Sequence, residues 1–253
     1  MGNNNIMKTS TKYYLALFVF MIMFGCVINS NAQTSSDTVK TSMKNTVLSN
    51  HDFKLQLDVF FGFGTTNILI GKTTNNDDIN ISGGGGVGGT LSLIYAVTEQ
   101  IEVALSAGTQ ESSLSKKLDN GEGHFRRTML LATVKDKIGL TSDAILKIGA
   151  GVGYYIPGDL DIDASKVSGG AHNVFSYKPK VGFHGVAEVE VQMSESFSLG
   201  MGIKYYSVKY DIDTFKSDGR SYPTSWITGS DRDKVLKLDG SGFDISIFGA
   251  LGI

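Results

Sequence analysis

Apolar and polar side chains alternate along most of this chain with a period of two, which is the pattern of a β-strand whose two faces differ. In residues 55–64, every second side chain is large and apolar, and the positions between include Gln56, Asp58 and two glycines. Segment 126–135 carries Leu and Met on both faces, which leaves its register open. Including these two segments, the alternation predicts eight strands: 55–64, 87–97, 101–110, 126–135, 144–156, 181–193, 197–207 and 243–253.

The links between these strands alternate in length. Up-and-down membrane barrels have short periplasmic turns, long extracellular loops and an even number of strands. We therefore expect an all-β fold, a closed antiparallel up-and-down transmembrane β-barrel of about eight strands, in the outer membrane with a periplasmic N-terminus. The short links are 97–100, 136–143 and 194–196, and the long polar links are 65–84, 111–125, 157–178 and 211–240.

The two faces of the predicted strands differ in polarity, as is expected of strands that cross a membrane. One face is broad and aliphatic, whereas the other combines glycines with charged residues. A soluble barrel such as a lipocalin-like carrier, which is the alternative, would place the large apolar side chains inside. Aromatic residues on the apolar face gather near the strand ends, as in the interfacial belts of membrane proteins. These are Phe61, Phe63, Tyr154, Tyr205 and Phe243 at the outer end and Tyr95 and Phe197 at the inner end.

The N-terminus has the order of an export signal. Lys8 and Lys12 precede an apolar run at 13–28, and small residues precede a cleavage site after Ala32. A membrane anchor is the alternative, but 16 apolar residues fall short of the ~20 that span a bilayer; lipoprotein processing at Cys26 is a second alternative. We expect three parts: a cleaved signal peptide at 1–32, a flexible polar leader at 33–52 and the barrel at 53–253.

Overall charge and cysteine content narrow the function. The chain has 23 basic and 25 acidic residues, which gives no electrostatic footprint for nucleic acid. Cys26 is the sole cysteine and would leave with the signal peptide. A mature chain without thiols has no disulfides, no cysteine nucleophile and no cysteine-based metal site.

Charged residues on the minority face are expected to line the lumen. Ion pairs that neutralise one another are the simplest interpretation, because an unpaired charge in a confined space is costly. The alternative is a cation-preferring path, since five acids face two lysines; Arg127 and Lys135 would restore the balance if they also point inward. The expected lumen residues are Asp58, Glu102, Lys147, His184, Glu188, Glu190, Lys204 and Asp244.

No motif indicates catalysis, a metal or a cofactor. His51, His124, His172 and His184 belong to no serine-nucleophile signature. The acids Asp159, Asp161 and Asp163 lack the central glycine and terminal glutamate of a calcium loop. The glycines of 83–89 are followed by no phosphate-binding lysine, so they indicate a loop that enters a strand.

Three segments carry a resemblance to a known family. The turn YAVTEQI (95–101), the strand KIGAGVGYY (147–155) and the closing segment LDGSGFDISIFGALGI (238–253) resemble the small outer-membrane barrels grouped with the OmpA transmembrane domain and the OmpW-like porins. The resemblance covers 53–253. It implies outer-membrane lipid and the barrel-assembly machinery as partners. Family members commonly end on an aromatic residue, whereas this sequence ends on Ile253.

The expected function is that of a non-enzymatic outer-membrane barrel, with a structural role in the envelope or restricted passage of small molecules through a narrow lumen. A lipid-modifying barrel enzyme and a loop-mediated adhesin or receptor are the alternatives. In the long link 211–240, Tyr222 and Trp226 are candidates for contact with an unidentified extracellular ligand, because exposed aromatic residues anchor interfaces. Ordinary packing within the loop is the alternative for both.

Overall fold

The computed structural model of this protein describes residues 53–72, 75–115, 121–167, 170–228 and 231–253. The predicted signal peptide, the polar leader and His51 lie outside the described residues. Among the described residues, no helix is both long and apolar enough to cross a bilayer.

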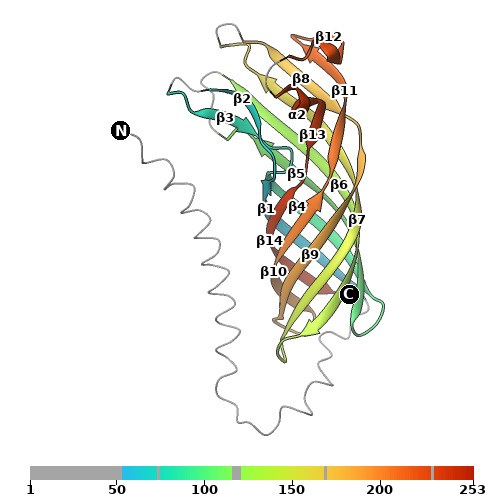
Figure 1. Cartoon of the computed structure of the whole chain (residues 1–253). Helices are drawn as coiled ribbons and strands as arrows, with labels where there is room; N and C mark the ends of the chain where they lie inside the picture. The colour runs from blue at the N-terminus through green and yellow to red at the C-terminus, as the bar shows by residue number, and fades with distance from the viewer. Residues whose placement is uncertain (1–52, 73–74, 116–120, 168–169, 229–230) are drawn as a thin grey trace. The chain divides into compact units, whose positions relative to one another are not determined.

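Eight strands of the described chain form one closed antiparallel barrel (Figure 1). Each strand pairs with the next along the chain, and the pairing of the first with the last closes the wall. The predicted fold class and all eight predicted strands are confirmed. The wall strands are β1 (Phe53–Gly64), β4 (Gly86–Ala96), β5 (Ile101–Ser113), β6 (Glu122–Gly139), β7 (Ala144–Asp163), β9 (Lys180–Gln192), β10 (Phe197–Ser207) and β14 (Gly242–Gly252).

The period-two pattern decides which side chains face outward. In β1, Leu57 and Phe61 are about 60% exposed, whereas Gln56 and Phe60 are 1% exposed. Successive side chains of a strand point to opposite faces, so the wall turns a continuous apolar surface outward, as lipid requires. In β6, whose register the sequence left open, Met129 and Leu131 face inward together with Arg127 and Lys135, while Leu130 faces out.

Strands continue beyond the barrel end that carries the long polar links. This end is called the outer end, and the end with the short turns is called the inner end. β8 is paired with the outer end of β7 and with β11, so β8 and β11 prolong the wall hairpin that β9 and β10 begin. Much of these long polar links is therefore regular strand, because cross-strand pairing satisfies their backbone groups. The additional elements are β2 (Ile68–Lys72), β3 (Asp78–Ile81), β8 (His172–Tyr177), β11 (Lys209–Ser217), β12 (Arg220–Tyr222), η2 (Thr224–Trp226), α2 (Arg232–Leu236) and β13 (Lys237–Asp239).

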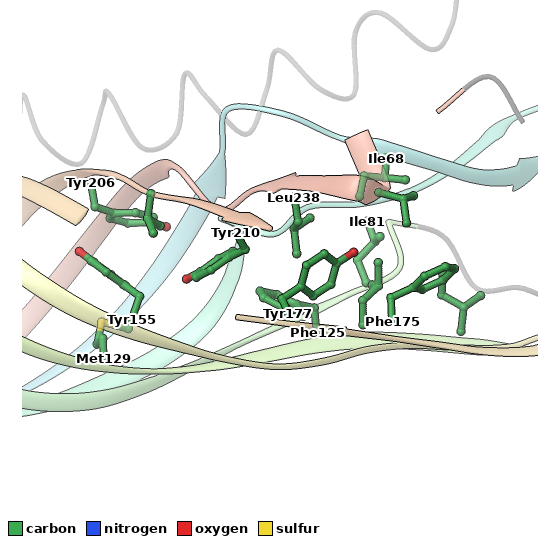
Figure 2. Close-up of a cluster of buried hydrophobic side chains, with 14 of the residues drawn as sticks. Ile68, Ile81, Phe125, Met129, Tyr155, Phe175, Tyr177, Tyr206, Tyr210 and Leu238 are labelled. Carbon is green, nitrogen blue, oxygen red and sulfur yellow. The ribbon is translucent and has the colours of Figure 1, made fainter. Parts of the chain in front are cut away.

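An apolar core fills the outer half of the barrel and extends into the structure above it (Figure 2). Tyr155 and Tyr206 lie at its inner end, Tyr210 and Leu238 in its middle, and Ile68 of β2 near the outer end. Each of these five side chains is at most 2% exposed. The barrel is therefore closed toward its outer end by packed side chains.

Candidate functional site: the barrel lumen

The structure places all eight of the expected lumen residues inside the barrel. Seven are buried, and the side chain of Lys204 is 14% exposed. They come from β1, β5, β7, β9, β10 and β14, which alternate their side chains between lipid and lumen. The inward positions thus form one connected interior.

The inner end of the lumen is closed by an ion network around Lys147. Its ammonium lies 2.8 Å from Glu102 Oε1 and 2.5 Å from Glu190 Oε2. Lys54 Nζ and the Ser198 hydroxyl both donate to the other oxygen of Glu190, at 2.9 and 2.8 Å. These contacts join five wall strands across the interior, so the network occupies the cross-section instead of lining an open path.

Polar pairs continue in the middle of the lumen. Lys135 donates to both carboxylate oxygens of Glu188, at 2.9 and 2.7 Å. His184 Nε2 lies 2.8 Å from the Thr133 hydroxyl, and Thr90 donates to Asp58 at 3.0 Å. Beside these pairs lies a cavity of about 40 Å³. Such a cavity has room for a few water molecules.

The inward charges show no excess of acids. Within the described part of the chain, the five predicted acids share the lumen with at least five bases instead of two. Arg127 and Lys135 point inward, as the charge argument from the sequence had considered. Lys54 was missed because the predicted strand began one residue later; it has the parity of Gln56 and Asp58, so a longer strand would have included it. The acid excess behind the cation-preferring alternative is therefore absent from the described lumen.

A constriction around Arg127 separates this polar interior from the apolar outer half. The guanidinium donates to Gln110 Oε1 at 2.9 Å and to the Gly240 carbonyl at 2.6 Å. It also lies over the Tyr206 ring, 4.2 Å from its centre, which adds a cation–π interaction. Since Arg127 is 1% exposed, its planar fork is held from several sides and blocks the lumen.

The glycine-rich run allows chain segments to pack closely at this constriction. A Cβ on Gly84 would overlap the carbonyl of Ser241, and the Tyr206 hydroxyl donates to the Gly84 carbonyl. Gly86 begins β4 with a φ of 108°, which side chains rarely tolerate. The run is thus the entrance to a strand, as predicted, and it also lets the segment before β14 lie inside the barrel mouth.

The wall pairing is interrupted near the outer end. The ladder between β7 and β9 ends at Tyr155 opposite Lys180, and pairing with β8 resumes at Leu160 opposite Phe175. Between these pairs lie Pro157 on one strand and Pro179 on the other, and proline has no N–H to donate. This stretch of wall is held by fewer backbone hydrogen bonds than its surroundings.

The aromatic residues proposed for ligand contact lie above the barrel. The rings of Tyr222 and Trp226 are stacked, with centres 5.3 Å apart. Trp226 is 64% exposed, whereas Tyr222 is partly buried. Among the described residues, no hydrogen bond, ion pair or ring contact joins them to the lumen residues, so the two sets of predicted residues belong to separate sites.

Within the described chain, His184 lies apart from the other two histidines, which both border Asp161. His184 faces the small lumen cavity, which has no room for an acyl chain. His172 Nε2 lies 2.9 Å from Asp161 Oδ1 on the outer sheet, where His124 is the cross-strand neighbour of Asp161. No group of three or more metal-binding side chains is found among the described residues.

A closed eight-stranded wall, aliphatic outside and charged inside, defines this protein as an outer-membrane β-barrel. The solved structure of OprG from Pseudomonas aeruginosa is similar over 82% of this chain and 99% of that chain, with a TM-score of 0.54 and 14% identity. The solved structure of Neisserial surface protein A is similar over 80% of this chain and 97% of that chain, with a TM-score of 0.48 and 12% identity. Neither a protein-family model nor a curated protein sequence matches the chain. The predicted resemblance to small outer-membrane barrels is confirmed at the level of the fold.

Proposed function

We propose that this protein is a non-enzymatic, non-conducting outer-membrane barrel, a structural component of the envelope that holds an ordered platform outside the cell. The filled lumen carries this proposal. Ion pairs occupy its inner end, Arg127 its constriction and packed aromatic side chains its outer half. Eight strands enclose little more space than side chains fill, so a free aqueous path is not expected.

The proposed orientation puts β8, β11 and β12 outside the cell and the short turns in the periplasm. Aromatic pairs at both ends of the wall support this placement in a bilayer. Tyr205 and Phe243 pack with ring centres 4.8 Å apart near the outer end, and Phe53 and Tyr95 do the same near the inner end. Outer-membrane lipid is then the partner of the wall between them, and the barrel-assembly machinery the partner during biogenesis.

Conductance of the purified protein in planar bilayers tests the proposal. We expect no stable channel steps in 1 M salt, with a trimeric porin reconstituted in the same bilayers as the positive control. Large, long-lived steps from correctly folded protein would show that the lumen opens and would contradict the non-conducting role.

The interrupted wall supports a second candidate function, the passage of small apolar molecules sideways between the barrel mouth and the membrane. The inner side of the interruption is apolar, with Tyr155 and Tyr177 buried behind it. Two strands separate at less cost in free energy where their pairing is interrupted than where it is intact, because fewer hydrogen bonds are lost.

Substitution of the wall prolines separates the two candidates. Pro157→Thr with Pro179→Thr supplies two backbone donors and should reduce uptake of an apolar dye by cells if the gap is the route. Pro223→Thr, between β12 and η2 and outside the barrel wall, is the matched control. Equal uptake by all variants and by cells lacking the protein would exclude lateral passage.

A further inference from the structure

Four aromatic rings form a continuous ladder along the arm above the barrel, defined as β8, β11, β12 and η2. Phe175 and Phe215 stack with centres 5.1 Å apart and planes 10° from parallel. Phe215 continues to Tyr222 at 6.2 Å, and Tyr222 to Trp226 at 5.3 Å. The ladder begins in the apolar core, where Phe175 is 7% exposed, and ends on the surface at Trp226.

The arm holds this ladder in a fixed position. Asp218 and Gly219, with φ of 48° and 77°, make the tight turn that joins β11 to β12. The Asp218 carboxylate accepts a hydrogen bond from the His172 N–H at 2.9 Å, and the Asp218 N–H donates to the His172 carbonyl at 2.8 Å. An exposed aromatic residue on a rigid segment loses little conformational entropy when it binds a ligand.

The surroundings of Trp226 do not suit a protein partner. Of the exposed large apolar side chains in the described chain, Trp226 alone belongs to the arm; the others lie on the wall or its inner turns. A stable protein interface buries about 800 Å² on each partner around several apolar anchors, and the described arm offers one. A single flat ring matches a smaller partner with one apolar face.

Arg220 adds an unpaired positive charge beside this ring system. It lies two residues before Tyr222 on β12, and alternate residues of a strand share a face. Arg220 is exposed and has no hydrogen-bond or ion-pair partner among the described residues. Its planar guanidinium suits a carboxylate, which it can bind through two parallel hydrogen bonds.

We propose that Trp226, Tyr222 and Arg220 form a binding site for an acidic sugar unit of an extracellular polysaccharide. The C–H face of a uronate ring would stack on the exposed indole, and its carboxylate would pair with Arg220. The inference rests on the extracellular orientation proposed above. A free polysaccharide is the expected source, because β12 and η2 lie at the far end of the arm from the wall (Figure 1).

Fluorescence tests the site directly, because Trp226 is the only tryptophan of the chain. The full-length protein in nanodiscs of phosphatidylcholine without lipopolysaccharide would be titrated with trigalacturonate and with neutral maltotriose. We expect a saturable change in emission with trigalacturonate and an affinity at least fivefold lower for maltotriose. Arg220→Ala should weaken trigalacturonate binding about tenfold, as loss of a charge-assisted hydrogen bond does, and Tyr222→Ala should weaken both sugars.

Arg126→Ala is the matched control, since it removes an exposed arginine of β6, outside the arm, and should leave both titrations unchanged. Equal affinity for the two sugars, unchanged binding by Arg220→Ala, or no response to either sugar would overturn the proposal. A response that requires lipopolysaccharide in the nanodisc would also overturn it, in favour of a membrane-bound glycan. These outcomes are independent of conductance, and both faces of a nanodisc are accessible, so failure of the sugar site is distinct from failure of the proposed function or orientation.

Discussion

At the scale of single residues, Lys147 shows how a buried charge organises the lumen. It is 0% exposed and touches two carboxylates from different strands, Glu102 and Glu190. Taking an ammonium out of water costs several kcal/mol, which the two carboxylates offset only while all three groups remain in place. Removing one of these charged groups therefore costs more free energy of folding than the intact network contributes, because the remaining charged groups stay buried without a partner.

We predict that Lys147→Met lowers the free energy of unfolding in lipid vesicles by about 3–5 kcal/mol, the usual cost of breaking a buried pair. Urea titration followed by heat-modifiable gel mobility measures this change. Adding Glu102→Gln to Lys147→Met should recover part of the loss, because Lys147 is the ion-pair partner of Glu102 and the second substitution removes the charge left unpaired. Lys137→Met, at a half-buried position on the neighbouring strand, should cost much less. Similar losses for Lys147→Met and Lys137→Met would argue against a stabilising ion network.

At the scale of one element, β14 separates lipid from lumen between adjacent residues. Ile247 is 68% exposed on the outer face, whereas Ser246 is half-buried and borders the lumen cavity. Asp244, two residues before Ser246, shares its face and pairs with Lys204 at 3.2 Å. A shift of one residue in register would exchange the two faces.

Arginine substitutions test this facing. Ile247→Arg should destabilise the barrel by ~2–4 kcal/mol, because the guanidinium would face hydrocarbon without a partner. Ser246→Arg should cost less, since acids lie within the lumen to compensate its charge. The folded fraction in vesicles, read from gel mobility, compares the two variants. The reverse order would refute the register, and two negligible effects would mean that β14 does not span the bilayer.

A second element, α2, is tied to the β2–β3 hairpin through Asp231. The Leu69 N–H donates to the Asp231 carboxylate at 2.7 Å and, together with Lys234, holds the pKa of that carboxyl below its ordinary value of 3.8. A group with a lowered folded-state pKa stabilises the fold above its unfolded pKa and loses this effect as pH falls through the folded value.

The hairpin should therefore loosen only below about pH 4, where this carboxylate begins to protonate. We expect amide exchange at Leu69, corrected for the intrinsic rate, to quicken from pH 6 to pH 3. Asp231→Asn should show the quickened exchange already at pH 6. Asp233→Asn, whose side chain is 94% exposed, serves as the control. Unchanged protection in Asp231→Asn would show that other contacts hold the hairpin.

At the scale of the whole molecule, the barrel is an asymmetric object in its membrane. One end carries short turns, and the other carries strands, a helix and an apolar core that continue beyond the wall. Folded structure on one side suits the open environment outside the cell, since long connections of outer-membrane barrels are extracellular.

Single cysteines report which end faces outward, because removal of Cys26 with the signal peptide leaves a background without thiols. Lys166→Cys, beyond the outer end of β7, should react with a membrane-impermeant maleimide on intact cells. Glu195→Cys, in the short turn between β9 and β10, should react only after the cells are opened. The opposite pattern would invert the proposed orientation. Mass spectrometry of the same mature chain should begin at Gln33, as cleavage after Ala32 predicts.

The sequence by itself determined the eight wall strands and which side chains face lipid, because a period of two is a local property of each strand. It also identified the inward acids, Lys147 and Lys204. It could not fix the register of 126–135, where Met129 and Leu130 look alike but face opposite ways. Only pairing with β5 and β7 decides that register, and with it the inward direction of Arg127 and Lys135.

The tertiary structure alone decided how the barrel is closed. Polar composition predicted loops where β8 and β11 pair, because hydrogen bonds between strands distant in the chain leave no local hydrophobic period. The plug formed by Arg127, Tyr206 and the carbonyl of Gly240 joins three segments that the sequence separates widely. The alternation of side chains between the two faces of a strand follows from the residues of that strand alone. Contacts across the lumen, in contrast, exist only after the wall has closed.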